Sequence, residues 1–530
     1  MKIFTLFTLT LLVTLGFSSE KDEISQMFKT NSVLEKYLSP LGPTPSVYSK
    51  DLVDTLFGEY MEEREKIISK DKSLRFTKDV PSLTPDEEVI DAYLKVLRGE
   101  MIHEDDSPLL LDFYDGQAII KDSEAHDFFL GMPKGGHMHV HIEASIAMKT
   151  FISFTYNDFV YFNIDTQELK TAPNGMDEEG FLKCNDLRRN WNLEGTFDEY
   201  LTNLLLLQPE DISSKQSHEI WKAFQPKFAL NDAVIHYYEF YRQGLLDYYR
   251  QAVDEGVFIA ELRHASGIIF DENHNFLSLQ EEFDLYKSVI DEIKKENPDF
   301  QMTVIVVAFK VLGKEHVMEQ LESYLYAMDH GYDFITGFDL VNEEEFTEPI
   351  SHFAEDMIKA KVGYPDFNFY FHSGESSDRN NENLYDAILL GTKRIGHGIN
   401  IVLHPHLVDL VVEKNIGYEI CPISNLILGY TLDMRWHPAR ELMARGVPVT
   451  ISSDDPTFWN YRGISLDFTY AFLAWDLDLK DIKQLAINSI HQSSIKDDIK
   501  PKMLEKFYNE WDDFISDFSK KADVLSKLAK

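Results

Sequence analysis

The chain has 530 residues, 44% of them hydrophobic, which is enough to bury a large core and to form more than one structural unit. Its 51 basic and 90 acidic residues give a formal net charge of −39 at pH 7. Because a protein this acidic repels polyanions, we expect neither nucleic acid nor an anionic membrane surface among its partners.

The first residues predict a secretory signal peptide. Lys2 is followed by an apolar stretch over residues 3–17 and then by Ser18 and Ser19. This is the layout of a cleaved export signal, and the stretch falls short of the ~20 apolar residues that a membrane-spanning helix needs. We therefore expect residues 1–19 to be removed and the mature protein to be secreted and extracellular, with no membrane insertion.

The sequence contains two cysteines in different settings. Cys184 lies in a polar stretch and is expected in a loop, whereas Cys421 ends the apolar run that begins at Ile416. We expect no disulfide between them. An exported protein without disulfides must owe its stability to the size of its core.

Residues 20–130 have a helical pattern. Thr84-Pro-Asp-Glu87 combines an N-cap, a proline at the first helical position and a capping-box glutamate, and an amphipathic apolar pattern follows. Similar apolar stripes cover residues 24–38 and 52–68. No catalytic motif occurs here, so these helices are expected to pack either on the rest of the chain or on a second subunit.

From residue 131 to 530 the pattern changes to alternating strands and helices. After the first strand comes a long insertion, about 145–215, which is rich in aromatic residues and could cover a site or bind a partner. A helix is expected around 220–255. Short apolar strands are expected at 135–141, 257–263, 303–308, 334–340, 367–372, 394–397, 417–421 and 447–452. Eight such strands separated by helices predict an α/β fold, a (β/α)8 barrel of the TIM type.

Polar side chains follow these strands at their carboxyl ends, where barrel enzymes place their active sites. His139 and His141 are two residues apart on the first strand and therefore point the same way. His372 and Asp454 end two later strands. Three imidazoles and one carboxylate suit zinc and leave a position open for water, so we predict one Zn²⁺ ion per subunit.

Two further side chains are expected beside the metal. Glu375 follows His372 by three residues and could exchange a proton with a substrate atom, and His397 could hold or deprotonate a water molecule. A divalent ion lowers the pKa of a bound water towards neutrality. The residues therefore predict metal-assisted hydrolysis.

The motifs that carry these residues are Met132-Pro-Lys-Gly-Gly, His139-Val-His141, His372-Ser-Gly-Glu375, Arg394-Ile-Gly-His-Gly398, Cys421-Pro-Ile-Ser-Asn425 and Ile451-Ser-Ser-Asp-Asp-Pro456. Together they resemble the adenosine deaminases, and most closely their secreted branch, the adenosine deaminase growth factors. The resemblance covers most of the chain after the signal peptide, including Gly337-Phe-Asp-Leu and Gln484-Leu-Ala-Ile-Asn-Ser489.

This resemblance implies hydrolysis of adenosine and 2′-deoxyadenosine to the inosines and ammonia. It implies that zinc is held by His139, His141, His372 and Asp454. Glu375 would protonate N1 of the purine, His397 would steer the water and Asp455 would hydrogen-bond N7. It also places Trp221 and His264 near the substrate pocket, although aromatic packing is the alternative role for Trp221. It makes the helices before residue 130 a homodimerisation element.

The chain departs from the family pattern in three places. Asn342 replaces a glycine whose backbone approaches the purine, and its side chain could crowd the base or point away. Glu143 stands near the aspartates that other members place against the ribose, and it could contact a ribose hydroxyl or be an ordinary loop carboxylate. In the secreted branch the 145–215 insertion binds a cell-surface receptor or glycan and carries a disulfide; Cys184 matches one half, without a partner near 155–165.

Two other functions are compatible with the same barrel. One is an extracellular adenosine-binding or growth-factor protein with little or no turnover, which Asn342 alone favours. The other is a related amidohydrolase acting on adenosine monophosphate or adenine, against which stand the predicted export and the lack of a Lys/Arg-rich phosphate cradle beside the motifs.

Overall fold

The computed structural model describes residues 50–73, 76–77, 80–102, 107–213 and 216–528. The chain divides into two compact units, residues 1–78 and 79–530. Helix α4 (Lys50–Ser73) belongs to the first unit and contains the helix predicted over 52–68. The predicted signal peptide and the helix predicted over 24–38 lie outside the described residues.

Helix α4 exposes a row of apolar side chains. Positions 53, 57, 60 and 67 are three, four or seven residues apart and lie along one side of the helix, and position 61 is one turn after 57. These side chains are Val53, Phe57, Tyr60, Met61 and Ile67. Phe57 and Tyr60 stack with ring centroids 6.2 Å apart. Among the described residues, no helix combines the length and apolar character needed to cross a membrane.

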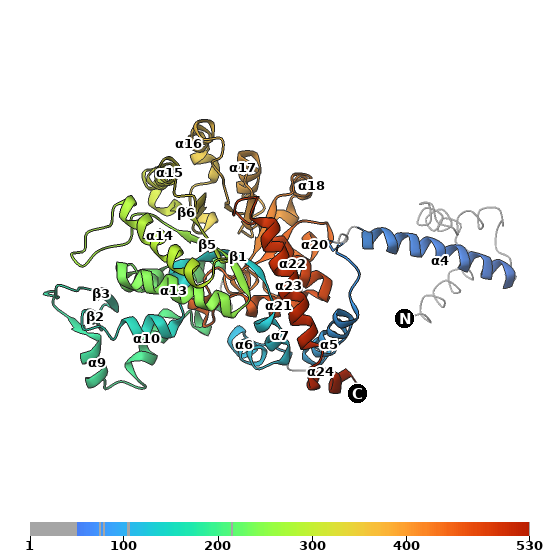
Figure 1. Ribbon diagram of the computed structural model, residues 1–530, viewed down its shortest axis with the longest axis horizontal. Helices are drawn as coiled ribbons and strands as arrows, with labels where there is room; N and C mark the ends of the chain where they lie inside the picture. The colour runs from blue at the N-terminus through green and yellow to red at the C-terminus, as the bar shows by residue number, and fades with distance from the viewer. Residues whose placement is uncertain (1–49, 74–75, 78–79, 103–106, 214–215, 529–530) are drawn as a thin grey trace, which may run out of the picture. The chain divides into compact units, whose positions relative to one another are not determined.

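A closed barrel of parallel strands forms the centre of the second unit. Figure 1 shows three of its strands, β1, β5 and β6, among the surrounding helices. Two four-stranded sheets have the orders β1-β5-β6-β7 and β11-β10-β9-β8. Single parallel bridges join them, Val140 to Asp454 at one seam and Phe338 to Phe369 at the other. The strands are β1 (Gly135–His141), β5 (Val257–His264), β6 (Gln301–Phe309), β7 (Ile335–Val341), β8 (His372–Ser373), β9 (Arg394–His397), β10 (Gly417–Ile420) and β11 (Val449–Ile451). The predicted (β/α)8 barrel is confirmed.

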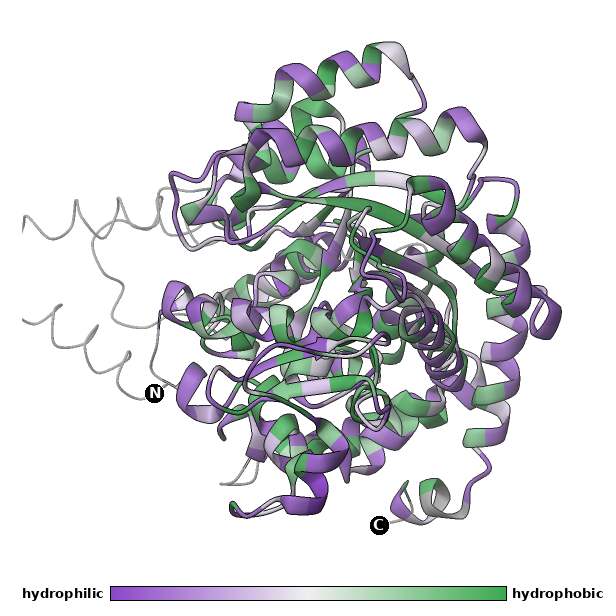
Figure 2. Ribbon diagram, turned by 90° about the vertical axis from the view of Figure 1, so that its left-hand side faces the viewer, coloured by the Kyte–Doolittle hydropathy of each residue, from purple (hydrophilic) through white to green (hydrophobic). Residues whose placement is uncertain are grey.

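Helices surround the strands, and their hydrophilic sides face outward in Figure 2. The helices and short 3₁₀ turns between the strands are α12 (Ser217–Ile235), α13 (Tyr238–Asp254), α14 (Leu279–Glu296), η3 (Lys310–Leu312), α15 (Gly313–His330), η4 (Glu344–Phe346), α16 (Ile350–Gly363), α17 (Asn383–Leu390), η5 (Ile399–Leu403), α18 (Pro405–Lys414), α19 (Pro422–Ile427), η6 (Met434–Trp436) and α20 (Ala439–Ala444). After β11 the chain continues through η7 (Pro456–Trp459), α21 (Ser465–Trp475), α22 (Leu479–His491), α23 (Lys500–Phe518) and α24 (Ala522–Leu528).

The strands form where the sequence offers short, nearly continuous apolar runs, because both faces of a parallel sheet are covered. All residues of β5 are buried, and so are those of β6 except its two ends. Strand β8 is shorter than the predicted 367–372. The preceding residues still contact β7, since Tyr370 N–H donates to the carbonyl of Phe338 at 3.0 Å.

The single helix predicted over 220–255 is two helices, α12 and α13, so that expectation was wrong. At the break, Tyr237 is extended, with φ −68° and ψ 125°. The backbone pairs there with the loop after β5: Tyr238 N–H donates to the Phe270 carbonyl at 3.0 Å, and Phe270 N–H donates to the His236 carbonyl at 2.9 Å. This pairing replaces two helical hydrogen bonds.

The insertion after β1 forms a small antiparallel sheet, with helices before and after it in the chain. Its elements are η2 (Ile142–Ala144), α8 (Met148–Phe154), β2 (Val160–Asn163), β3 (Glu168–Thr171), β4 (Phe181–Lys183), α9 (Cys184–Asn190), α10 (Phe197–Leu205) and α11 (Pro209–Ile212). The strand order is β3-β2-β4. Cys184 is buried at the start of α9 rather than in a polar loop. Both cysteines are free, as expected.

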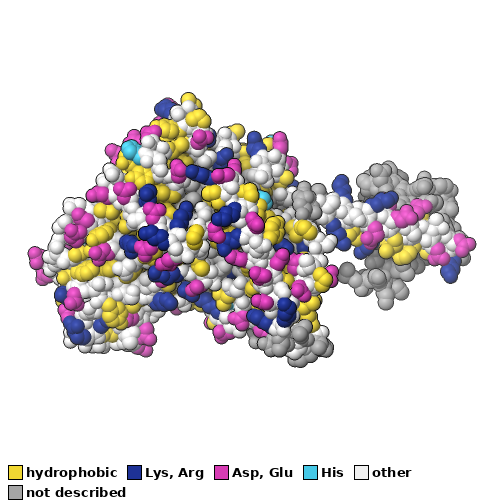
Figure 3. Space-filling model, in the orientation of Figure 1, with side chains coloured by type: hydrophobic (Ala, Val, Ile, Leu, Met, Phe, Trp, Pro, Cys, Tyr) yellow, Lys and Arg dark blue, Asp and Glu magenta, His cyan; other side chains and the backbone are white. Residues whose placement is uncertain are grey.

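Helices α5 (Pro85–Ile102), α6 (Phe113–Lys121) and α7 (Glu124–Gly131) precede the barrel and belong to its unit. The predicted cap of α5 is present: Glu87 N–H donates to Thr84 Oγ1 at 3.3 Å, and Thr84 N–H donates to Glu87 Oε2 at 2.8 Å. Glu87 also accepts from Trp511 Nε1 of α23 at 2.8 Å. On the face seen in Figure 3, acidic and basic side chains are interspersed, as expected for a solvated charged surface.

Candidate metal centre and active site

Three imidazoles and a carboxylate meet at the carboxyl end of the barrel. We call them the metal cluster: His139 and His141 at the end of β1, His372 at the start of β8 and Asp454 after β11. One donor atom from each lies within 4.8 Å of the others. Asp454 Oδ1 is 3.2 Å from His139 Nε2 and 3.3 Å from His141 Nε2. The cluster unites residues that are far apart in the sequence.

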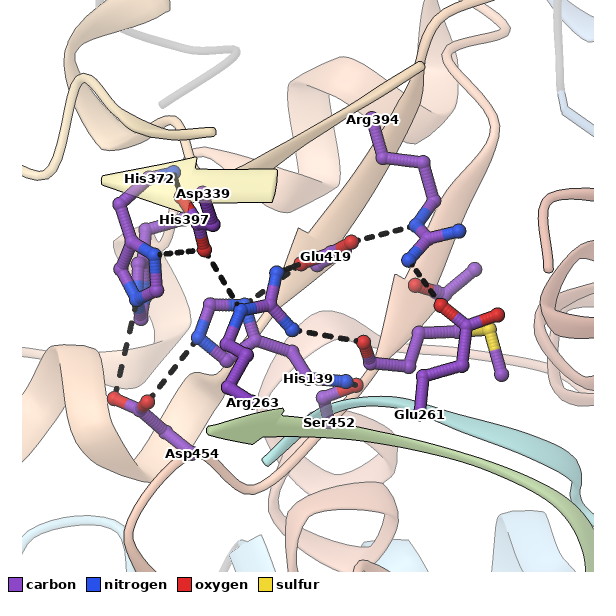
Figure 4. Close-up of polar contacts among 12 residues, drawn as sticks. His139, Glu261, Arg263, Asp339, His372, Arg394, His397, Glu419, Ser452 and Asp454 are labelled. Carbon is purple, nitrogen blue, oxygen red and sulfur yellow. Dashed lines mark hydrogen bonds and ion pairs between the residues drawn. The ribbon is translucent and has the colours of Figure 1, made fainter. Parts of the chain in front are cut away.

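Buried carboxylates orient two of the imidazoles (Figure 4). His139 Nδ1 lies 2.7 Å from Glu419 Oε2, and His372 Nδ1 lies 2.7 Å from Asp339 Oδ2. Each carboxylate therefore accepts the Nδ1 proton and leaves Nε2 as the free lone pair, the arrangement that supports a histidine ligand. Burial also lowers the pKa of His372 to about 4, so this imidazole is neutral at pH 7.

The donor atoms themselves are consistent with a bound cation. His139 Nε2 and Asp454 Oδ1 are buried, and neither has a hydrogen-bond partner among the described residues. Buried polar atoms without partners are costly, and they are expected where an ion completes the site. Three imidazoles and one carboxylate are a donor set that zinc accepts. The residues of the metal cluster thus fit a zinc ion.

The loop after β11 turns sharply to present Asp454. Its φ of +63° is left-handed, a conformation rare for residues other than glycine. Two backbone hydrogen bonds to β1 hold this turn: Asp454 N–H donates to the His139 carbonyl at 3.1 Å, and His141 N–H donates to the Asp454 carbonyl at 3.2 Å. Ser424 Oγ donates to Asp454 Oδ2 at 2.8 Å and fixes the carboxylate.

An ionic network lies in the barrel interior beneath the metal cluster (Figure 4). Arg263 Nε donates to Asp339 at 2.9 Å, and Arg394 Nε donates to Glu419 at 2.5 Å. Arg263 also pairs with Glu419, and Arg394 with Glu261. All five side chains are fully buried. Although burial disfavours charge, the two arginines hold the pKa of Glu419 well below its usual value.

Glu375 and His397 lie beside the metal cluster. His397 Nδ1 is 3.5 Å from Glu375 Oε1, and His397 Nε2 is 3.9 Å from Asp454 Oδ2. Burial and the Asp454 carboxylate raise the pKa of Glu375 well above its ordinary value. Burial lowers the pKa of His397 well below its ordinary value. These shifts favour a protonated carboxyl group beside a neutral imidazole, one able to donate a proton and the other to accept one.

Asp455 is a second buried carboxyl group at this end of the barrel. Burial and then the charge of Asp454 raise its pKa well above its ordinary value. Its Oδ1 has no hydrogen-bond partner among the described residues. A protonated Asp455 could therefore donate a hydrogen bond to a ligand acceptor.

Glu143 and His264 are joined by a hydrogen bond in a buried cluster. His264 Nδ1 is 3.1 Å from Glu143 Oε1, and His264 Nε2 is 2.8 Å from Glu282 Oε1. Although burial disfavours the charged imidazole, the carboxylates of Glu282 and Glu143 raise the pKa of His264 to about 9. His236 Nε2 lies 3.8 Å from the same Glu143 oxygen. Glu143 is thus a partner of two histidines rather than a free loop carboxylate.

Trp221 and Asn342 have partners of their own. Trp221 is buried in α12, and its Nε1 donates to the hydroxyl of Tyr430 at 2.9 Å. Asn342 follows β7 with φ +103°, a region that favours glycine. Its side chain turns to the neighbouring loop, where Oδ1 accepts from Val311 N–H at 3.2 Å.

Our sequence reasoning missed the residues that support the metal cluster. None of Glu261, Arg263, Asp339, Arg394 and Glu419 was singled out as a functional side chain. A detectable pattern was present, however: charged residues within strands that are otherwise apolar. Glu261 and Arg263 are two residues apart on β5 and therefore face the same side, the barrel interior.

Comparisons with known proteins agree with this arrangement. A family model described as Adenosine deaminase matches residues 206–510. "Adenosine deaminase 2" of Dictyostelium discoideum is 31% identical over 486 residues, which cover 87% of this chain and 87% of the relative. "Adenosine deaminase 2" of Homo sapiens is 28% identical over 439 residues, which cover 78% of this chain and 84% of the relative.

Solved structures share the fold at lower identity. Adenine deaminase from Arthrobacter aurescens has a TM-score of 0.53 and 18% identity, covering 71% of this chain and 98% of that one. An amidohydrolase from Burkholderia ambifaria with bound Zn has a TM-score of 0.56 and 17% identity, covering 75% and 95%. The N6-mAMP deaminase of Arabidopsis has a TM-score of 0.54 and 16% identity, covering 72% and 99%. At these identities the likeness concerns the fold.

Proposed function

This chain belongs to the adenosine deaminase family, and from that premise we propose that it is a secreted, zinc-dependent enzyme that hydrolyses adenosine and 2′-deoxyadenosine to inosine and 2′-deoxyinosine with release of ammonia. The observation that carries the proposal is the convergence, at one end of the barrel, of the metal cluster with Glu375, His397 and Asp455. Together they supply a metal site, a proton donor, a proton acceptor and a hydrogen-bond donor.

In the proposed mechanism the metal cluster holds zinc. A bound zinc ion lowers the pKa of a water molecule and makes it a better nucleophile near neutrality. Glu375 is protonated because burial and Asp454 raise its pKa, and it donates this proton to N1 of the purine. Protonation at N1 makes C6 more electrophilic, so that C6 accepts the water oxygen.

His397 and Asp455 complete the proton transfers and the binding of the base. The neutral imidazole of His397 takes a proton from the water as its oxygen adds to C6. That proton then passes to the amino group on C6, which leaves as ammonia, while the remaining hydroxyl proton returns to the Glu375 carboxylate as the C6 carbonyl forms. Asp455, protonated through its raised pKa, donates a hydrogen bond to N7. N7 has a lone pair and no proton, so only the protonated carboxyl group can make this bond.

The nucleoside sugar is assigned to the side of the site that carries Glu143. Glu143 is fixed by His264 and accepts a hydrogen bond from a ribose hydroxyl, while Trp221 and His264 complete the wall of the pocket. Asn342 borders the base at the end of β7. We assign its backbone N–H to the purine side, since its side chain is held by the hydrogen bond from Val311 N–H.

We assign helix α4 and the insertion at about 145–215 to interactions with macromolecular partners. The exposed apolar side of α4 would pair with a second subunit in a homodimer. The insertion would bind a cell-surface receptor or glycan, and it contains a surface pocket of about 1000 Å³ between α8 and α10, with Tyr156 and Tyr200 in its lining. A growth-factor-like activity would depend on this insertion.

Three substrates test the proposed function. Purified, zinc-replete protein is incubated separately with adenosine, adenosine monophosphate and adenine, and deamination is followed by the change in ultraviolet absorbance. We expect turnover of adenosine and little of the other two. Preference for the monophosphate or for adenine would replace the proposed substrate, and no turnover of any of them would favour an extracellular adenosine-binding protein.

A further inference from the structure

The carboxylate of Glu344 bonds directly to the backbone of the loop that carries Glu375. Glu344 follows β7 and is only 5% exposed. Its Oε1 accepts from the backbone N–H of Glu375 at 2.8 Å, and its Oε2 accepts from the backbone N–H of Gly374 at 3.1 Å. A single side chain therefore binds two successive amides of the loop after β8.

Glu344 and its neighbour Glu345 make further hydrogen bonds to the same loop and to the residues that follow it. Glu344 Oε2 also accepts from Asn381 Nδ2 at 3.0 Å and from Asn383 Nδ2 at 2.6 Å. Glu345 Oε1 accepts from the hydroxyl of Ser376 at 2.7 Å and from Ser377 N–H at 3.1 Å. Residues 374–377 are thus attached, one after another, to two consecutive carboxylates from the adjacent strand end.

The backbone of this loop has a left-handed conformation at Gly374, and the hydrogen bonds to Glu344 and Glu345 stabilise it. Gly374 has φ +77°, and a Cβ atom there would lie 2.5 Å from Asn400 Oδ1 and 2.9 Å from Leu384. The turn can therefore be made only by glycine, and it places Glu375 directly after the tight point. An unsupported turn of this kind would sample other conformations.

The side chain of Glu375 has little else to hold it. Its Oε1 is buried and has no hydrogen-bond partner among the described residues, and the closest imidazole nitrogen, His397 Nδ1, is 3.5 Å away. The position of the carboxyl group is consequently set by its backbone. The bond from Glu375 N–H to Glu344 acts on that backbone directly.

A buried lysine lies close to these carboxylates. Lys310, the first residue of η3, is 2% exposed, and its Nζ has no hydrogen-bond partner among the described residues. Burial lowers the pKa of Lys310, and the nearby carboxylates of Glu344 and Asp339 oppose that shift. These two carboxylates therefore favour the charged form of Lys310 beside Glu344.

We propose that Glu344 is a positioning residue for Glu375, with Glu345 as its auxiliary, and that the hydrogen bonds to the amides of residues 374 and 375 aim the Glu375 carboxyl group at the purine. The inference rests on the proposed role of Glu375 as proton donor. Glu344 is not part of the metal cluster, and in this proposal it acts through Glu375. Misplacement of a catalytic group by about 1 Å costs on the order of 100-fold in rate.

The test is Glu344→Gln, which keeps the shape of the side chain but replaces one acceptor oxygen with an NH2 group that cannot accept. We expect kcat to fall on the order of 100-fold, with KM for adenosine, the Kd for inosine and the zinc content within about two-fold of the parent protein. Glu348→Gln is the matched control, since Glu348 lies in the same loop but is exposed. It should leave every one of these quantities unchanged.

Glu345→Met provides a milder variant should Glu344→Gln fold poorly. It keeps the length of the side chain but has no oxygen acceptor, so it removes only the hydrogen bonds from Ser376 and Ser377, and we expect roughly a 10-fold loss in kcat with KM unchanged. A loss of zinc, of inosine binding and of kcat together would indicate a structural role and would overturn the inference.

Two further results separate this inference from the proposed function. An inactive Glu375→Gln protein beside a fully active Glu344→Gln protein would remove the positioning role alone. An active Glu375→Gln protein would remove the proton donor, and with it both proposals.

Discussion

His372 Nδ1 lies 2.7 Å from Asp339 Oδ2, and the same aspartate accepts the backbone N–H of His372 at 2.7 Å through its other oxygen. One carboxylate thus fixes both the main chain and the ring of a residue in the metal cluster. Arg263 in turn binds Asp339 at 2.9 Å. The orientation of the donor Nε2 atom is therefore determined by residues on two other strands.

Replacing Asp339 should weaken metal binding. Asp339→Asn keeps the volume of the side chain but removes the charge that stabilises the Nδ1 proton and leaves Arg263 with one ionised partner fewer. Loss of such a supporting carboxylate typically lowers metal affinity 10- to 100-fold, and we expect a decrease in this range for zinc. Competition with a chromogenic chelator measures it. Zinc affinity equal to that of the parent protein would show that Asp339 serves only the ionic network.

Glu375→Gln should abolish deamination while zinc stays bound. The amide cannot deliver a proton to N1, yet Glu375 is not part of the metal cluster, so the donor set is unchanged. General acid catalysis typically contributes about 10²- to 10⁴-fold, and we expect kcat to fall by at least that much. Steady-state kinetics with metal analysis on the same sample checks both statements. Turnover close to that of the parent protein would contradict the assignment of the proton donor.

The pH dependence of kcat should be bell-shaped, with an alkaline limb above the ordinary pKa of a glutamate and an acid limb below the ordinary pKa of a histidine. The active form has Glu375 protonated, so activity is full below its raised pKa and is lost as the pH rises through that value. It also has His397 neutral; because burial lowers the pKa of His397, activity persists below the usual histidine range and falls only at lower pH. Initial rates at saturating adenosine across the acid and alkaline ranges measure the two limbs. A rate that rises steadily with pH, with no alkaline limb, would contradict the protonated state that we give to Glu375.

Removal of the metal should affect both activity and stability. The metal cluster brings an Asp454 oxygen within 3.3 Å of two imidazole nitrogens, and this oxygen and His139 Nε2 are buried without hydrogen-bond partners among the described residues. A ligand that binds only the folded state stabilises it by RT ln(1 + [L]/Kd), about 2.7 kcal/mol at a hundredfold excess over Kd. We expect chelation to abolish turnover and lower Tm by several degrees, and added zinc to restore both. Full activity after verified removal of zinc would exclude a metal-dependent mechanism.

The barrel and the metal cluster were predictable because their patterns are local. An apolar run of four to eight residues ending in a histidine or aspartate can be recognised from a short window of sequence, and the repetition of such runs predicts that their ends meet. His139 with His141 and His372 with Glu375 are examples in which two functional residues lie within three positions of one another. The fold class follows from the same count of strands.

The supporting contacts could not be predicted, because they join residues far apart in sequence through the barrel interior. Glu419 is 280 positions from His139, and Asp339 is 33 positions from His372. Which buried carboxylate meets which imidazole depends on strand order and register, and these are tertiary properties. The break between α12 and α13 has the same origin, since the pairing of Tyr238 with Phe270 overrides a continuous helical pattern.

Asn342 should tolerate glycine better than alanine. Its φ of +103° is strained for any side chain, at a cost of about 1–3 kcal/mol, and glycine relieves that strain. Glycine also loses the hydrogen bond from Val311 N–H, worth about 1 kcal/mol, and increases the entropy of the unfolded chain, so the two effects nearly cancel. Alanine keeps the strain and loses the bond. Urea unfolding should therefore give Asn342→Gly a free energy of unfolding close to that of the parent protein, and Asn342→Ala one about 1 kcal/mol lower.

The same Asn342→Gly variant tests whether the side chain crowds the substrate. Because the asparagine side chain is turned onto Val311, KM for adenosine should change less than two-fold. A several-fold decrease in KM would instead mean that this side chain occupies space that the substrate needs.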